Sequence, residues 1–183
     1  KAILFMKQMD FLLLGTDQLV NTYNIIRSIK HQPKEGSFTI FATVVDSGYE
    51  GPQSSLNNFA DFCSIARIPG FTITNKSDAD YILPNYLVQP GFRIIGISQR
   101  LFKTEIIDNV TPLKIYNDGA IFEYSRGDDV TIVSFNFSFP QARKLAGELK
   151  AGGIESAHLN VNSALATDWQ IIQESVSKTK KVI

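Results

Sequence analysis

Residues Asp46 to Gln53 form a glycine-rich polar turn directly after a strand-like run of apolar residues. The turn reads Asp-Ser-Gly-Tyr-Glu-Gly-Pro-Gln, and the run before it, Phe38–Val45, is continuous and apolar, as in strands buried on both faces. Ligands of parallel α/β sheets bind at the carboxyl ends of strands, where this turn would lie. Gln53 and Ser54 can hydrogen-bond a hydroxyl group but cannot carry a proton at neutral pH. The turn alone therefore predicts a ligand site.

The other residue types that perform chemistry are few and scattered. The chain has one cysteine, Cys63, and two histidines, His31 and His158, which lie far apart in sequence. A nucleophilic thiol needs a neighbouring base, and a zinc site needs regularly spaced cysteines and histidines. The sequence therefore predicts neither, and Cys63 is expected to be a small buried apolar residue.

Composition excludes several classes of function. The 183 residues are 44% hydrophobic, so they can bury a core as one domain or two small ones. Lysine plus arginine equals aspartate plus glutamate at 18 each, which argues against nucleic-acid binding through phosphate neutralisation. The apolar run Ala2–Met6 is too short to span a membrane and is not organised like a signal peptide. We therefore expect a soluble protein of a reducing compartment, the cytoplasm.

Helix-like and strand-like segments alternate through the first hundred residues. Apolar residues recur at near-helical spacing between Asp10 and Ile29. Ser77, with Asp80 three residues on, is the expected cap of a helix that reaches Tyr86. This alternation is typical of a parallel α/β sheet. The other predicted elements are a helix over Leu56–Ile65 and strands over Phe38–Val45, Phe71–Thr74 and Phe92–Ile97.

A second α/β unit is predicted after a polar segment. Lys103–Arg126 mixes charges with β-branched residues, contains proline and glycine, and is expected to be a linker with some extended structure. Pro140 suits the first turn of a helix that Ser138 caps and Gly152 ends. The predicted elements of this unit are strands over Asp129–Phe135 and Ser156–Val161, helices to Ala151 and over Asp168–Lys178, and a short strand at Lys181–Ile183.

Three groups of segments, spread over nearly the whole chain, match one family in order and spacing. They are Asp10-Phe11 with Asp17-Gln-Leu-Val-Asn21; Asp46–Pro52 with Ala66–Gly70 and Ser77-Asp78; and Gly127–Phe135 with Asp168-Trp169 and Glu174–Thr179. In these features the chain resembles the transketolase-like superfamily of thiamin diphosphate enzymes, which includes transketolase and the beta subunit of 2-oxoacid dehydrogenases.

The resemblance implies a fold and a cofactor. Residues 1–102 would form a pyrimidine-binding domain with a doubly wound, mostly parallel sheet that is incomplete at its start. A linker over 103–126 and a second small α/β domain over 127–183, incomplete at its end, would follow. The implied cofactors are thiamin diphosphate and magnesium. Phe11 and Asp10 are the residues implied to bind the cofactor, and Phe11 stands where the family stacks an aromatic residue on the aminopyrimidine ring.

The resemblance also implies a substrate wall and a partner. Asp46, Ser47, Gln53 and Ser54 would bind the oxygens of a sugar phosphate or a 2-oxoacid. The diphosphate and its magnesium would be held by another chain or by absent sequence, so this chain is assigned no metal ligand. We expect a homo- or hetero-oligomer with a chain that carries the diphosphate-binding domain, and no nucleic-acid or membrane partner.

Four departures from the family pattern bear on activity. The glutamate that hydrogen-bonds the aminopyrimidine ring would lie upstream of Lys1. Val44, Val45 and Ser54 stand where the family has proton-handling histidines. Asn117-Asp-Gly119 is similar to the family's metal-binding Gly-Asp-Gly but is expected to be a simple turn. Asn162 stands where the second domain usually has arginine.

Three interpretations therefore stay open. The first is an enzyme subunit that transfers a two-carbon unit or decarboxylates a 2-oxoacid together with a partner. The second is a non-catalytic scaffold or interaction subunit of the same fold. The third is an unrelated doubly wound domain that binds a small ligand at the glycine turn.

Overall fold

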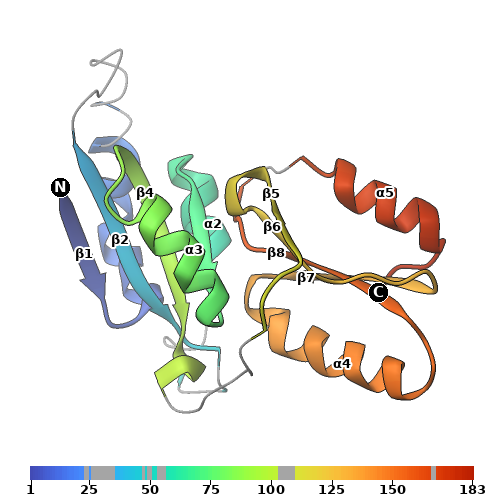
Figure 1. Ribbon diagram of the computed structural model, residues 1–183. Helices are drawn as coiled ribbons and strands as arrows, with labels where there is room; N and C mark the ends of the chain where they lie inside the picture. The colour runs from blue at the N-terminus through green and yellow to red at the C-terminus, as the bar shows by residue number, and fades with distance from the viewer. Residues whose placement is uncertain are drawn as a thin grey trace.

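The computed structural model describes residues 1–22, 25, 36–46, 48, 51–52, 57–102, 110–165 and 168–183. These residues form two α/β units, each built around a four-stranded sheet (Figure 1). The first sheet has the strand order β1-β2-β4-β3 and is parallel throughout. The second has the order β5-β6-β8-β7 and is mixed. The predicted fold class, a doubly wound parallel sheet followed by a small α/β unit, is confirmed.

The strands of the first sheet are the apolar runs of the sequence. Strands β2 and β4 pair over their full length, from Ser37 with Gly91 to Val44 with Ser98. Their side chains are mostly buried, as expected for a sheet covered on both faces. The bounds are Ala2–Met6 for β1, Ser37–Val44 for β2, Gly70–Ile73 for β3 and Gly91–Ser98 for β4.

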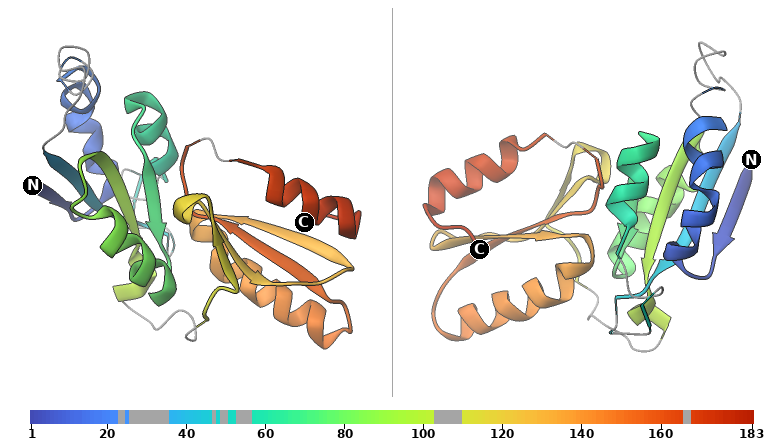
Figure 2. Two further views of the ribbon diagram at one scale, coloured as in Figure 1. Left: turned by 45° about the horizontal axis from the view of Figure 1, so that its top comes forward. Right: turned by 180° about the vertical axis from the view of Figure 1, so that it is seen from behind.

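Helices cover both faces of this sheet (Figure 2). One face packs against the 3-10 helix η1 (Met9–Gly15), the π-helical turn η2 (Gln18–Thr22) and α2 (Phe59–Ala66), through a core that includes Ile40 and Ile94. The other face packs against α3 (Lys76–Tyr86), with Ile95 and Ile82 in contact. Successive residues of β4 thus point to opposite helical layers, as the alternation of side chains along a strand requires.

Two details of the predicted elements are wrong. The helix expected over Asp10–Ile29 is wound as 3-10 and π turns up to Thr22, with Leu12 and Leu19 buried and Leu13 and Leu14 facing outward. Beyond Thr22, all of the predicted helix except residue 25 lies outside the described residues. The cap of α3 is Asn75 and not Ser77: Asn75 Oδ1 accepts a hydrogen bond from the Asp78 amide at 2.9 Å. The chain enters this helix two residues earlier than predicted, and the Ser77 hydroxyl instead donates to the Val110 carbonyl at 2.7 Å.

The second unit places helices on opposite faces of its sheet (Figure 1). Helix α4 (Phe139–Ala151) packs through Ala142 and Ala146 against Ile132, and α5 (Gln170–Thr179) packs through Ile171 and Ile172 against Leu159 and Val161. The strands are β5 (Lys114–Tyr116), β6 (Ile121–Ser125), β7 (Val130–Phe135) and β8 (Ser156–Val161), with short 3-10 turns η3 (Gln99–Phe102), η4 (Asn117–Gly119) and η5 (Asn136–Ser138).

This second sheet begins inside the segment expected to be a linker. Strands β5 and β6 form an antiparallel hairpin, and β6 pairs in turn with β8. The expected turn at Asn117-Asp-Gly119 joins the two strands, with φ of 50°, 53° and 87° at its three residues. Strand β5 forms the edge of the sheet, whereas β6 lies inside it and is mostly buried. Val182 forms a bridge beside Thr131, so the chain end extends the opposite rim, where a short strand was predicted.

The two units contact each other through the edge of β3. The Thr72 amide donates to the Asn162 carbonyl at 3.1 Å, and the Ala164 amide donates to the Gly70 carbonyl at 3.0 Å. Phe137 from η5 enters the first core, where its ring meets that of Phe59 edge-on with centroids 6.2 Å apart. The segment after β8 therefore covers an edge of the first sheet. Among the described residues, no helix is long and apolar enough to cross a membrane.

Candidate functional site

The carboxyl edge of the first sheet gathers several of the residues expected to bind ligands. Because β1, β2 and β4 run parallel, the segments that follow them emerge at one edge. Asp10 and Phe11 follow β1, Asp46 follows β2, and Arg100 follows β4. Ser47, Gln53 and Ser54 lie outside the described residues. The edge predicted from the glycine-rich turn is thus the edge at which the described candidates meet.

Asp46 is fixed at this edge by two partners from β4 and η3. Its Oδ2 atom accepts hydrogen bonds from the Ser98 hydroxyl at 2.6 Å and from Arg100 Nε at 3.1 Å. Arg100 Nη2 also donates to the Phe137 carbonyl at 3.1 Å, which links the edge to the second unit. Asp46 Oδ1 is buried and accepts no hydrogen bond from the part of the chain that the structure describes. One carboxylate oxygen is therefore held in an ion pair while the other is left to accept a bond.

Asp10 and Phe11 differ sharply in exposure. The Asp10 side chain is buried, and its Oδ1 atom accepts a hydrogen bond from Asn58 Nδ2 at 3.3 Å. Phe11 keeps 45% of its surface exposed. Asn58 directly precedes α2, so Asp10 joins the end of β1 to the end of the glycine-rich segment. Asp10 is thus buried and hydrogen-bonded, whereas the ring of Phe11 is partly exposed.

The glycine turn needs glycine at two described positions. Gly48 has φ of 135° and Gly51 has φ of 138°, conformations that a residue with a Cβ atom rarely adopts. A side chain at either position would therefore strain the turn. The spacing of these two glycines in the sequence was a sound signal for a turn of special geometry.

A second polar group, which the sequence did not predict, lies buried between the two units. Asp78, at the start of α3, accepts hydrogen bonds at one oxygen from the Thr74 amide at 2.8 Å and the Thr74 hydroxyl at 2.7 Å. Its other oxygen accepts from Asn162 Nδ2 at 2.9 Å and from the Tyr124 hydroxyl at 3.2 Å. Burial raises the pKa of Asp78, and these hydrogen bonds counteract that rise.

The same group continues through the second sheet to His158. Asn160 Nδ2 donates to Asn162 Oδ1, and the Ser134 hydroxyl donates to Asn160 Oδ1 at 2.7 Å. Ser134 has a single hydrogen, so His158 Nε2, 2.7 Å from the hydroxyl oxygen, is the donor in their contact. The donors therefore all point from His158 toward Asp78. His158, Asn160 and Asn162 alternate along β8, and three polar residues at a period of two in a buried strand were the sequence signal for this chain of bonds.

His158 is held neutral by its surroundings. It is fully buried between the rings of Tyr124 and Phe139, and burial together with the nearby Arg143 charge lowers its pKa to about 4. Among the described residues its Nδ1 atom has no hydrogen-bond partner, which agrees with the tautomer that carries the proton on Nε2.

The titration of His158 predicts acid sensitivity. A pKa near 6.5 in the unfolded chain and about 4 in the folded chain means that the unfolded state binds the proton more tightly. The stability is fully present above pH 6.5 and is lost as the pH falls toward 4. We expect the His158 contribution to the free energy of unfolding to fall by about 2 kcal/mol between pH 8 and pH 5. Urea unfolding of the wild type and His158→Gln at both pH values measures it, and equal losses in both proteins would contradict the assignment.

Two other kinds of site considered from the sequence are a reactive thiol and a metal site. Cys63 is fully buried, and burial raises the pKa of its thiol to about 12, so it packs as a small apolar residue, as predicted. Within the described ranges, no group of three or more histidine, cysteine, aspartate or glutamate side chains is placed to hold a metal ion.

Comparisons with known proteins identify the fold. No family model matches the sequence, and no curated protein does either. The structure is similar to a split-gene transketolase in an inactive beta4 tetramer, with a TM-score of 0.67 and 19% identity over 98% of this chain and 55% of that chain. It is also similar to the transketolase of Pichia stipitis in complex with sedoheptulose 7-phosphate, with a TM-score of 0.62 and 14% identity over 95% of this chain and 25% of that chain.

The chain spans only part of the length of the proteins whose structures it resembles. A transketolase variant from Pichia stipitis gives the same result, with a TM-score of 0.63, 14% identity, 95% of this chain covered and 25% of that chain. The chain spans about half of the split-gene chain and a quarter of the Pichia stipitis chains. At these identities the likeness concerns the fold, and both units of the structure share it. The protein has a transketolase-like fold.

Proposed function

We propose that this chain supplies the pyrimidine side of a thiamin diphosphate site in a transketolase-like enzyme, and that a partner chain completes the site. The observation that supports this proposal is the half-exposed ring of Phe11 at the carboxyl edge of the parallel sheet. A flat heteroaromatic ring gains dispersion and quadrupole contacts on such a face. Asp10, buried and bonded to Asn58, fixes the backbone that presents the ring.

The residues fit one half of the cofactor. Phe11 provides the stacking face, whereas the described residues contain no cluster of metal ligands for a magnesium-bound diphosphate. The diphosphate half therefore belongs to a partner chain in this proposal. When bound, thiamin diphosphate supplies a stabilised carbanion for carbon–carbon bond cleavage. The reaction class we propose is transfer of a two-carbon unit or decarboxylation of a 2-oxoacid.

The substrate would meet the wall built around Asp46. The Arg100 guanidinium and the Ser98 hydroxyl hold one carboxylate oxygen of Asp46, which orients this side chain at the edge that would meet the substrate. Ser47, Gln53 and Ser54 belong to this wall by the family resemblance. Such a set binds and orients a sugar phosphate or a 2-oxoacid, and the proton transfers are assigned to groups outside this chain.

Phe11→Ala tests the cofactor assignment. In the complex purified through a tag on this chain, we expect the affinity for thiamin diphosphate with Mg²⁺ to fall about fivefold, since one aromatic stack contributes about 1 kcal/mol. Isothermal titration calorimetry measures it. Phe135→Ala is the matched control, because Phe135 is also half exposed, at 49%, but lies on β7 of the second sheet. No heat with the wild-type complex, or equal affinity for Phe11→Ala, would sink the proposal.

The second candidate is a non-catalytic scaffold subunit of the same fold. It is favoured by the ion pair between Asp46 and Arg100, which occupies the acidic group expected to meet substrate. If Phe11→Ala and Gln53→Ala both leave the activity of the assembled complex unchanged, the scaffold interpretation replaces the first.

We further propose that the protein works as a cytoplasmic oligomer with a chain that carries the diphosphate-binding domain. The similar split-gene transketolase chain was solved as a tetramer. Apolar residues of β1 support association, because Ile3, Leu4 and Phe5 are 48%, 41% and 64% exposed on an edge strand.

A further inference from the structure

We propose that a cavity between α4 and the second sheet binds a phosphate group. The cavity has a volume of about 270 Å³ and lies at the rim where β6 ends and β8 begins. Arg126 from the end of β6, Arg143 and Lys150 from α4, and Glu155 from the start of β8 line it. This site lies in the second unit, away from the edge that carries Phe11 and Asp46.

Its lining has an excess of positive charge. Arg126 is paired with Glu123, so two further cations, Arg143 and Lys150, share the one carboxylate of the lining, although the chain as a whole has no net charge. Arg143, Gly147 and Lys150 recur at helical spacing, so one face of α4 turns both cations toward the cavity. Charges of one sign gathered in a cavity with low-dielectric walls raise the local potential for an anion.

The Arg143 guanidinium is one of the cationic groups that line the cavity. Arg143 is partly buried, and it makes no hydrogen bond or ion pair with any residue that the structure describes. Its charge does act inward, because it contributes to the lowered pKa of His158. A planar guanidinium donates two parallel hydrogen bonds to a phosphate, which makes it a suited anchor for this group.

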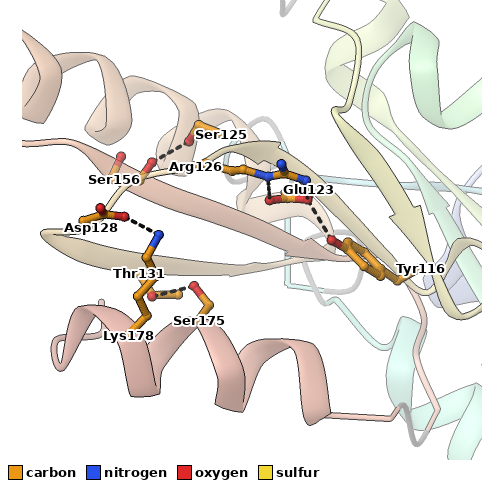
Figure 3. Close-up of polar contacts among 9 residues, drawn as sticks. All are labelled: Tyr116, Glu123, Ser125, Arg126, Asp128, Thr131, Ser156, Ser175 and Lys178. Atoms are coloured by element: carbon orange, nitrogen blue, oxygen red, sulfur yellow. Dashed lines mark hydrogen bonds and ion pairs between the residues drawn. The ribbon is translucent and has the colours of Figure 1, made fainter.

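Two other cations of this unit, Arg126 and Lys178, are paired with carboxylates (Figure 3). Arg126 Nε donates to Glu123 Oε1 at 2.7 Å, and Glu123 Oε2 also accepts from the Tyr116 hydroxyl at 2.8 Å. Lys178 on α5, across the sheet, forms an ion pair with Asp128. Both of these cations have a carboxylate partner, whereas Arg143 and Lys150 of α4, which line the cavity, face a single carboxylate, Glu155. The charge imbalance is therefore local to the α4 side.

Gly147 supports the same inference because its missing side chain leaves room in the cavity. Glycine within a helix costs about 1 kcal/mol relative to alanine. A Cβ atom built on Gly147 would meet no atom within 4 Å, so close packing does not require glycine here. It lies on the cavity wall one turn after Arg143 and leaves room for a ligand beside the guanidinium.

Titration with inorganic phosphate at constant ionic strength tests the proposal. We expect saturable binding to the full chain, seen by calorimetry, and at least tenfold weaker binding to Arg143→Gln. Lys144→Gln is the matched control, since Lys144 is the next residue of α4, is exposed and pairs with Glu148. Glycerol 3-phosphate in a parallel titration distinguishes a phosphate monoester, which would bind more tightly, from free phosphate.

Gly147→Leu separates binding in the cavity from attraction by charge. Leucine favours helix, keeps every charge and fills the space beside Arg143, so we expect the loss seen with Arg143→Gln. The proposal is overturned if wild type shows no saturable binding, if Arg143→Gln and Lys144→Gln weaken it equally, or if Gly147→Leu binds as wild type does. Thermal unfolding confirms that each variant is folded. Loss of thiamin diphosphate binding in Phe11→Ala has no bearing on this outcome.

Discussion

Asp78→Ala is expected to lower the free energy of unfolding by about 4 kcal/mol. Asp78 is fully buried and accepts hydrogen bonds from Thr74, Asn162 and Tyr124, which belong to both units of the structure. Alanine leaves these buried donors without an acceptor, and each unsatisfied donor costs about 1–3 kcal/mol. Urea unfolding followed by circular dichroism measures the loss. A decrease below 1 kcal/mol would show that the contact between the units does not depend on this carboxylate.

An exchange of side chains tests the direction of the bonds. Asp78→Asn alone turns an amide hydrogen toward the Asn162 amide, which is also a donor at 2.9 Å, so it is expected to destabilise. Combining it with Asn162→Asp restores an acceptor opposite the new donor. We expect the double variant to be more stable than either single one, and additivity in the double-mutant cycle would contradict the proposed pairing.

The pH dependence of Asp78 runs opposite to that of His158. Burial raises the pKa of Asp78 above its ordinary 3.8, so its contribution to stability is present below that value and is lost as the pH rises through the folded pKa. The two groups are joined by one chain of hydrogen bonds and titrate with opposite sign. Each contribution must therefore be read from the difference between wild type and the matching variant.

Gly127→Ala is expected to destabilise the protein by about 3 kcal/mol. A Cβ atom at Gly127 would lie 2.3 Å from the carbonyl carbon and oxygen of Glu155 and 2.5 Å from the Ser156 amide nitrogen. All three are backbone atoms at the start of β8, so relief requires the strand itself to move. Differential scanning calorimetry should show a midpoint lower by about 9 °C for a chain of this length.

Gly147→Ala is the control for this prediction. The substitution is the same, but at Gly147 nothing lies within 4 Å of the new atom and the residue is inside a helix. It is expected to stabilise the protein by about 1 kcal/mol. If both variants lose stability, the close approach of Gly127 to β8 is not the cause of the first effect.

Continuous apolar runs allowed the sequence to predict much of the fold. The strand expected at Phe38–Val45 is such a run and forms β2, shifted by one residue. Such runs can only be satisfied by burial, so their local pattern decides their structure. The winding of η1 and η2 and the hairpin of β5 and β6 depend on which neighbours cover them, and a local pattern contains no such information.

In the candidate site, too, the sequence predicts the position of one residue but not the partners that are distant in sequence. Asp46 lies at the strand end where the sequence predicts it, because parallel strands place their carboxyl ends at one edge. Its partners Ser98 and Arg100 lie about fifty residues later, at the end of β4 and in η3, and the register of β2 with β4 brings them together. The series of hydrogen bonds from His158 to Asp78 likewise joins residues far apart in sequence, from β8 of the second unit to α3 of the first.

The segment after β8 has a consequence for how copies of this chain can associate. It covers the β3 edge of the first sheet, so in the described part of the chain β1 is the edge of that sheet open to a further strand. A sheet with two open edges can add copies without limit and grow into a fibre. A sheet with one open edge reaches closure after a single pairing related by a two-fold axis. The contact between the units thus removes one of the two edges at which the first sheet could add a further strand.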